Sequence, residues 1–168
     1  SIIVTKCPQN LSEEKQNELR KKLTVSPNQQ VFFSTINYHS KTLGSLQISI
    51  DVLHEYEIIL ITGIANPTPL VEFLKGRYCK IQHIAFSDHH HFTSQEIDKI
   101  KFKYDEITSE KKIVLTTEKD YMRLVDQISE LSYLEIATEF LEGKERFIND
   151  IKSFCRIASY LYHLPGQF

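Results

Sequence analysis

The stretch EIILITGI, residues 57–64, is the part of the sequence that decides the fold. It is an almost continuous apolar run that contains a single glycine, Gly63, next to its end. A strand with one solvated face alternates apolar and polar residues, whereas a continuous run indicates burial on both faces. The stretch therefore predicts a central strand of a mostly parallel sheet.

Outward from this strand, β-rich runs alternate with helical patterns along the whole chain. The expected strands are residues 2–5, 31–36, 47–52, 57–64, 80–88, 112–117 and 133–140. This alternation predicts an α/β fold with helices on both faces of the sheet. We expect residues 1–168 to form a single α/β domain, because neither a linker nor a repeat interrupts the pattern.

Capping patterns and apolar stripes predict where the helices lie. Asn10 with Glu13, and Thr93 with Glu96, have the spacing of capping boxes at helix starts. Two prolines, Pro67 and Pro69, suit the first turn of a further helix, and EKDYMRL opens another after residue 117. A closing helix from about residue 144 carries an apolar stripe made of Phe147, Ile151, Phe154, Ile157, Ala158 and Leu161.

Composition limits the classes of function. The net charge is −2, from 20 basic and 22 acidic residues, and no Lys/Arg tract favours a nucleic acid as partner. The three cysteines are far apart, which favours structural thiols in a reducing compartment. No apolar run approaches the ~18 residues of a membrane span, and we expect no signal peptide.

The beginning of the chain gives a further expectation. The sequence starts SIIVTKCP, without Met, and a strand is expected from residue 2. We therefore expect the chain to be cut from a longer protein, whose other part completes any site found here.

Four polar or glycine-containing clusters follow predicted strands. They are TKCP (5–8), GIANP (63–67), SDHHHF (87–92) and TTEKD (116–120). In open α/β sheets, ligands bind beyond the carboxyl ends of the strands. These four clusters are therefore the candidate functional positions.

The three consecutive histidines, His89, His90 and His91, raise the question of a metal site. Side chains that follow one another in an extended segment point to opposite faces, so three together reach one ion only across a sharp turn. Neither a Cys ligand pattern nor HExxH supports zinc, and we predict no metal site. The alternatives are one histidine oriented by Asp88 for acid/base or charge-stabilising work, or a polar turn before a capped helix.

The other clusters also allow two interpretations each. Lys6 and Lys119, with threonines such as Thr5 beside them, suit a nucleotide or its phosphates, whereas Thr117 and Asp120 equally suit a helix start. Gly63 could line a cleft, and Asn66 could simply cap a helix. No GxxxxGK[ST] loop and no GxGxxG occurs in the chain, so these residues contain no common phosphate-binding motif for ATP.

Four segments, taken in order, carry a resemblance to a known family. IIVTKCP, ITGIANPTPLVEFL, HIAFSDHHHFTSQEI and VLTTEKDYMRL resemble the tetraacyldisaccharide 4'-kinases of lipid A biosynthesis. The resemblance covers residues 2–124, and DHHxFT followed by TEKD is its most characteristic part. It departs from the family pattern at Ser87, where proline is common.

The resemblance implies a Rossmann-like lobe of a P-loop kinase that uses ATP and Mg²⁺. Such a kinase phosphorylates tetraacyldisaccharide 1-phosphate at the cytoplasmic face of the bacterial inner membrane, to which it is attached peripherally. The P-loop and the catalytic base would lie in an amino-terminal lobe that this chain does not include. This chain would be the carboxyl-terminal lobe, and it would be inactive alone because its partner lobe in cis holds most of the ATP.

By motif, the resemblance also implies roles for single residues. His89 would face the transferred phosphoryl group. Asp88 would orient the His89 ring or cap the segment. The cleft wall would include Gly63 and Asn66. The remaining candidates for the nucleotide or the lobe interface are Thr5, Lys6, Lys119 and Asp120. The alternative function is a non-catalytic α/β binding or interaction module, which a parent sequence without GxxxxGK[ST] upstream would favour.

Overall fold

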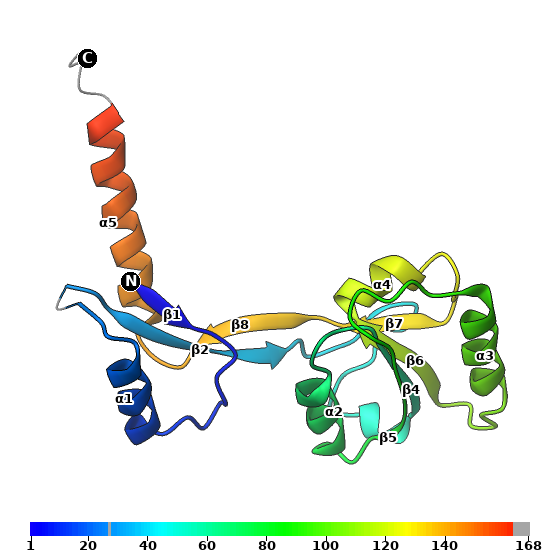
Figure 1. Ribbon diagram of the computed structural model, residues 1–168. Coiled ribbons are helices and arrows are strands. Elements are labelled where there is room, and N and C mark those ends of the chain that lie inside the picture. The colour runs from blue at the N-terminus through cyan, green and yellow to red at the C-terminus, as the bar shows by residue number, and fades with distance from the viewer. Residues whose placement is uncertain (27, 163–168) are drawn as a thin grey trace. The chain divides into compact units, whose positions relative to one another are not determined.

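The computed structural model describes residues 1–26 and 28–162, with side chains as far as residue 156 (Figure 1). The chain divides into two compact units. Unit 1 contains Ser1–Asn37 and Ala137–Phe168, and unit 2 contains Tyr38–Ile136. Each unit has a sheet of its own.

Unit 2 contains the central strand that the sequence predicted. Its five-stranded sheet has the order β3-β7-β6-β4-β5. The strands are β3 (Leu43–Gly44), β4 (Glu57–Thr62), β5 (Lys80–Ala85), β6 (Lys112–Thr117) and β7 (Leu131–Leu134). All neighbours pair in parallel except β3, which pairs with β7 in the antiparallel sense. The predicted fold class, a mostly parallel α/β sheet, is confirmed.

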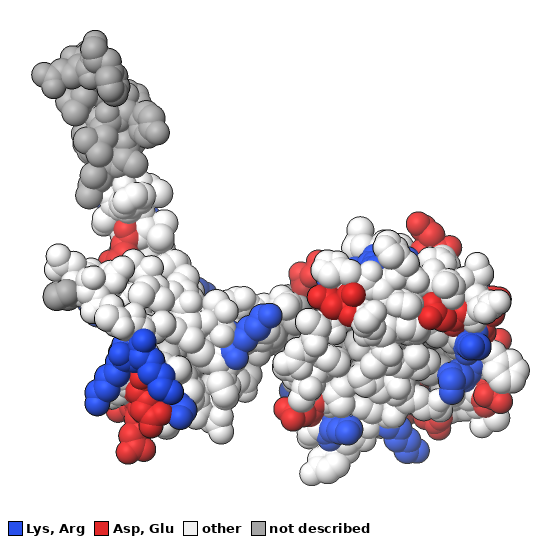
Figure 2. All heavy atoms as spheres, in the orientation of Figure 1, with Lys and Arg blue, Asp and Glu red and all other residues white. Residues whose placement is uncertain are grey.

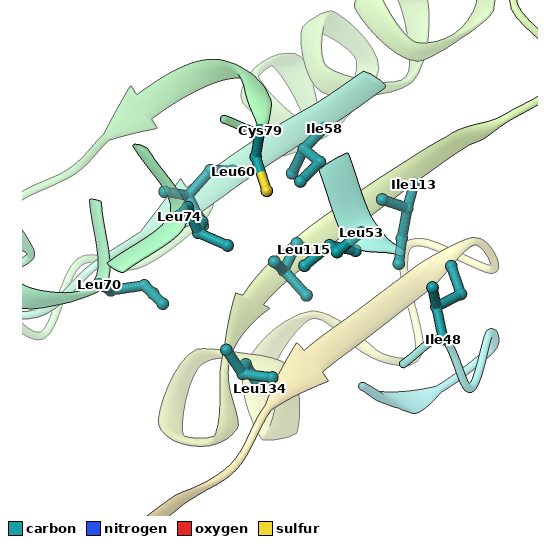
Figure 3. Close-up of a cluster of buried hydrophobic side chains, with 10 residues drawn as sticks. All are labelled: Ile48, Leu53, Ile58, Leu60, Leu70, Leu74, Cys79, Ile113, Leu115 and Leu134. Atoms are coloured by element: carbon teal, nitrogen blue, oxygen red, sulfur yellow. The ribbon is translucent and has the colours of Figure 1, made fainter. Parts of the chain in front are cut away.

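The apolar run of β4 is buried on both faces of this sheet. Ile58 and Leu60 belong to one buried cluster, which Figure 3 shows, whereas Ile59 and Ile61 belong to the other. All four side chains are at most 1% exposed. Full burial of one such side chain stabilises a fold by about 1.5–3 kcal/mol, so the run fixes β4 in the middle of the sheet.

Helices cover both faces, as expected. Helix α2 (Thr68–Lys75) contributes Leu70 and Leu74 to the cluster of Figure 3. On the opposite face lie α3 (Ser94–Asp105) and α4 (Glu118–Leu124), which contribute Ile97, Ile100 and Leu124.

The helix starts follow local chemistry, with small shifts from prediction. Thr93 and Glu96 form the predicted capping box of α3. Pro67 is the N-cap of α2, and Asn66 acts one residue earlier by accepting a hydrogen bond from the Thr68 N–H at 3.1 Å. In unit 1 the cap of α1 (Glu13–Lys22) is Ser12 rather than Asn10, because the Ser12 hydroxyl accepts from the Lys15 N–H.

The predicted edge strand at 47–52 is wrong. The Thr42 hydroxyl accepts from the Ile48 N–H at 2.9 Å and donates to the Leu46 carbonyl at 2.7 Å. These bonds close a loop over residues 42–48, and the short helix η1 (Leu53–Glu55) follows. The edge strand next to β7 is β3 instead, where Gly44 adopts a φ of 102° against Ser132 of β7.

The predicted strand 133–140 divides between the two units. Its first part belongs to β7 in unit 2, and its second part is β8 (Ile136–Phe140) in the three-stranded sheet β1-β2-β8. That sheet includes β1 (Ile2–Val4) and β2 (Val31–Tyr38), which pair in parallel. A continuous β-rich sequence therefore serves two sheets.

Unit 1 ends in α5 (Lys144–Tyr162), the predicted closing helix. Phe147 packs against Phe32 and Phe140, with ring centroids 5.2 and 5.0 Å away. Further along the predicted stripe, Ile151 and Phe154 are 46% and 71% exposed. Ile157, Ala158 and Leu161 lie outside the residues whose side chains are described.

The surface charges and the state of the cysteines can be compared with what the composition indicated. On the face drawn in Figure 2, acidic and basic side chains occur together on each unit. Cys7 and Cys79 are buried free thiols and Cys155 is an exposed one. Burial raises the pKa of the Cys7 and Cys79 thiols. In the described part of the chain, no helix is long and apolar enough to cross a membrane.

Candidate active site

Three of the four predicted clusters meet at one edge of the sheet in unit 2. Strands β5, β4 and β6 are neighbours and run in parallel, so their carboxyl ends lie together. Gly63 follows β4, the segment 86–93 follows β5, and Thr117 ends β6. This edge is the place where an open α/β sheet binds its ligands.

The fourth cluster belongs to a different sheet. Thr5 and Lys6 follow β1, which is part of the three-stranded sheet of unit 1. Both side chains are exposed, and Lys6 has a φ of 58°. Thr5 and Lys6 therefore lie on another sheet than the other three clusters, because β1 pairs with β2 and not with the strands of unit 2.

Asp120 is the buried centre of the edge. Its side chain is fully buried, and its Oδ2 accepts hydrogen bonds from the Gly63 N–H at 2.7 Å and the Thr117 hydroxyl at 2.9 Å. It therefore joins the end of β4 to the end of β6. A nucleotide that contacted Asp120, as predicted, would have to reach a buried carboxylate that already accepts hydrogen bonds from Gly63 and Thr117.

The Asp120 carboxylate limits the space for a side chain at residue 63. A Cβ on residue 63 would lie 3.1 Å from Asp120 Oδ1 and 3.5 Å from the Phe92 ring. A side chain at residue 63 would therefore press against the Asp120 carboxylate, and the Gly63 backbone is buried rather than open to a ligand. Asn66 is exposed and is occupied locally by the Thr68 N–H.

The segment after β5 makes a tight turn at residues 87–90. The His90 N–H donates to the Ser87 carbonyl at 3.2 Å, and His89 has a φ of 58°. A positive φ is unfavourable for a residue with a Cβ, and such strain is found preferentially at functional sites. The turn leaves the His89 side chain 80% exposed.

Asp88 fixes the outer side of this turn. Its Oδ1 accepts from the His89 N–H at 3.0 Å and from Lys119 Nζ at 2.7 Å. The bond from Lys119 is the main cause of a lowered pKa for the Asp88 carboxyl, so Asp88 is a carboxylate at neutral pH. Its Oδ2 lies 3.7 Å from His89 Nε2. The predicted Asp88–His89 pair and Lys119 are therefore brought together.

His90 has a different environment. Its ring stacks on Phe86 with centroids 4.6 Å apart, and its Nε2 lies 3.0 Å from Glu96 Oε2. The Thr93 N–H, then His90, then the Thr93 hydroxyl lower the pKa of Glu96 to about 2. His91 is exposed. Within the described residues, no group of three or more His, Cys, Asp or Glu side chains could hold a metal ion.

Two side chains at this edge, Arg123 and Phe92, were given no role from the sequence, although Phe92 lies within the predicted cluster 87–92. Arg123 follows Asp120 by one helical turn on α4, and its Nη2 donates to the His90 carbonyl. Its Cζ lies 5.5 Å from the centroid of the Phe92 ring. The available signal was the i, i+3 spacing of an acid and a base on a predicted helix.

Comparison with known proteins identifies the family. A sequence model described as tetraacyldisaccharide-1-P 4'-kinase matches residues 1–156. The chain belongs to this family. It is 40% identical over 149 residues to the tetraacyldisaccharide 4'-kinase of Flavobacterium johnsoniae, which covers 87% of this chain and 42% of that protein. The enzyme of the same name from Bacteroides thetaiotaomicron is 33% identical over 168 residues, covering 88% of this chain and 44% of its own length.

A solved structure of the family shares the fold. The structure of LpxK from Aquifex aeolicus in complex with ATP matches with a TM-score of 0.50 and 21% identity, over 82% of this chain and 44% of that one. The chain thus spans less than half the length of the relatives it matches. The family resemblance of the motifs is confirmed.

Proposed function

We propose that this chain is the carboxyl-terminal lobe of a tetraacyldisaccharide 4'-kinase, and that His89 is its main contribution to phosphoryl transfer. The reaction would move the γ-phosphoryl group of ATP to the 4'-hydroxyl of tetraacyldisaccharide 1-phosphate, giving lipid IVA. The observation that carries the proposal is the turn at 87–90. It exposes the His89 imidazole at the carboxyl edge of the sheet while hydrogen bonds hold the residues on both sides.

The residues at this edge fit contact with phosphoryl oxygens better than they fit Mg²⁺. His89 and Lys119 are exposed hydrogen-bond donors. The carboxylates of Asp88 and Asp120 are already bound to Lys119 and to the Gly63 N–H. Since the sequence has no GxxxxGK[ST] loop, we assign most of the binding of ATP and Mg²⁺ to an amino-terminal lobe of the longer protein.

Phosphoryl transfer depends mainly on positioning and on stabilisation of charge. His89 would donate a hydrogen bond to an oxygen on which negative charge develops, and Asp88 would hold the ring in place. The base that accepts the 4'-hydroxyl proton would come from the other lobe. Lys119, Thr5, Lys6, Gly63, Asn66 and Asp120 remain candidates for the nucleotide side or the lobe interface.

The substrate gives the proposed setting. A tetraacylated lipid is held in a bilayer, so the full-length protein would work at the cytoplasmic face of the inner membrane as a peripheral protein. This chain alone would be inactive, because it would lack the phosphate loop. Titration of the isolated chain with ATP and Mg²⁺ should show weak binding or none, and tight binding would contradict this division of labour.

The test of the proposal is the His89→Ala variant of the full-length kinase. Loss of one preorganised donor to developing charge costs about 10²–10³ in kcat, and we expect a loss of this size at an unchanged melting temperature. His91→Ala, on an exposed neighbour in the same segment, is the matched control and should keep normal turnover. Normal kcat for the His89→Ala enzyme would refute the proposed role.

A further inference from the structure

Arg123 contacts α4 and the segment after β5, and through Asp120 it is connected to the end of β4. On α4 it lies one turn beyond Asp120, and its Nη1 is 3.5 Å from Asp120 Oδ1. Its Nη2 donates to the carbonyl of His90, and its Cζ lies over the Phe92 ring. Through Asp120 it is also connected to the Gly63 N–H at the end of β4.

We propose that Arg123 is a positioning residue for His89, which holds the turn at 87–90 against the ends of β4 and β6. The inference rests on the proposed function of His89. It differs from that proposal because it assigns the placement of the imidazole to a residue on another element. Arg123 would not touch the substrate, the nucleotide or the reacting atoms.

The backbone of the turn needs an anchor. His89 has a φ of 58°, a conformation that is uncommon for a residue with a Cβ and that contacts around the turn can stabilise. One end of the constraint is the Asp88–Lys119 pair, whose side chains are 36% and 43% exposed. Exposed ion pairs hold a geometry weakly. The bond from the half-buried Arg123 to the His90 carbonyl anchors the backbone directly.

The buried charges of Asp120 and Arg123 favour the same role. Among the described residues, Asp120 Oδ1 and Arg123 Nη1 are buried and make no hydrogen bond. They face each other at 3.5 Å, so each compensates the charge of the other. A pair of this kind is weak evidence for stability, and one role attested for such pairs is to specify a single arrangement of the chain. Here the placement concerns the segment that carries His89.

The shape of the guanidinium group suits a link between two partners. It presents donors in a rigid fork, so one side chain can face a carboxylate and a backbone carbonyl at once. A lysine in this position would keep the charge opposite Asp120 but would lose the second contact. Glu96 supports the same segment from the other side, through His90 Nε2.

The test is a double-mutant cycle in the full-length kinase, with Arg123→Lys, Arg123→Met and His89→Ala. We expect either Arg123 change to lower kcat by about 10²-fold, as a displaced catalytic group does, with KM for ATP and lipid nearly unchanged. If Arg123 acts through His89, the Arg123→Lys change should add no further loss to His89→Ala. Millimolar guanidinium should partly restore kcat to an Arg123→Ala enzyme.

Arg77 is the matched control. Its Cζ lies 3.7 Å from the Phe73 ring centroid and its Nη1 donates to the Phe73 carbonyl at 3.4 Å, but it lies away from the turn. The Arg77→Met enzyme should keep its kcat.

The outcomes separate the two proposals. Normal kcat in Arg123→Lys would overturn the inference, as would an equal loss in the presence and absence of His89. Normal kcat in His89→Ala would refute the proposed role of His89 in phosphoryl transfer. Arg123→Lys keeps the charge opposite Asp120, so the test stands even if Arg123→Met does not fold.

Discussion

The two halves of the segment after β5 contrast sharply, although they are neighbours in the sequence. The outer half, Asp88 and His89, is solvated, and His89 is 80% exposed. In the inner half, His90 to Glu96, the His90 side chain packs: it is 24% exposed, lies on Phe86 and reaches Glu96. One turn of the backbone thus gives two adjacent histidines opposite roles. The two side chains are chemically identical, so the difference in their exposure comes from the contacts that hold the turn.

The largest expected effect comes from removing the anchor below both halves. Asp120→Ala would leave the Gly63 N–H without its acceptor and Arg123 without its countercharge. Breaking a buried pair costs about 3–5 kcal/mol, and we expect a loss of unfolding free energy near this range in urea denaturation. Asp98→Ala, on the exposed side of α3, should change it little. A loss below about 1 kcal/mol, the size of one ordinary hydrogen bond, would show that Asp120 is not the anchor.

A smaller effect should separate the two histidines directly. His90→Ala removes the stack on Phe86 and the contact with Glu96, and we expect it to lower the unfolding free energy by about 2 kcal/mol. His89→Ala changes an exposed side chain and should stay within about 0.5 kcal/mol. Equal losses in urea denaturation at neutral pH would remove the contrast between the halves.

The smallest effect concerns the response of the inner half to acid. The folded pKa of Glu96 is about 2, below its ordinary value of 4.5, because the Thr93 N–H and His90 favour the carboxylate. The folded state therefore binds fewer protons, and the stability from this group is complete above about pH 4.5 and is lost as the pH falls toward 2. Glu96→Gln should flatten the decline of the unfolding free energy in that window. Parallel curves for both proteins would contradict the assignment.

The sequence predicted well where the determining interactions are local. The run at 57–64 specified a strand buried on both faces, and Thr93 with Glu96 specified the start of α3. It predicted poorly in two places. The loop that Thr42 closes replaces the expected strand at 47–52, although its partners lie only four and six residues away. The strand predicted at 133–140 serves two sheets, which depends on pairing with strands distant in sequence.

The same division holds for the candidate site. The clusters at 63–67, 87–92 and 116–120 were found because polar residues follow strands, and parallel pairing brings strand ends together. TKCP has the same local pattern, yet β1 pairs in another sheet. Arg123 was missed because its importance depends on the His90 carbonyl, a partner 33 residues away in sequence.

The sequence by itself determined the central strand, the capping box of α3 and the polar clusters that follow strands, since apolar periodicity and capping act within a few residues. Only the tertiary structure decided that Asp120 is buried, that His90 packs and that His89 is exposed. The burial of Asp120 depends on strand pairing, which sets the ends of β4 and β6 against each other. The opposite environments of His89 and His90 come from the turn at 87–90, whose His90 carbonyl accepts from Arg123 of α4.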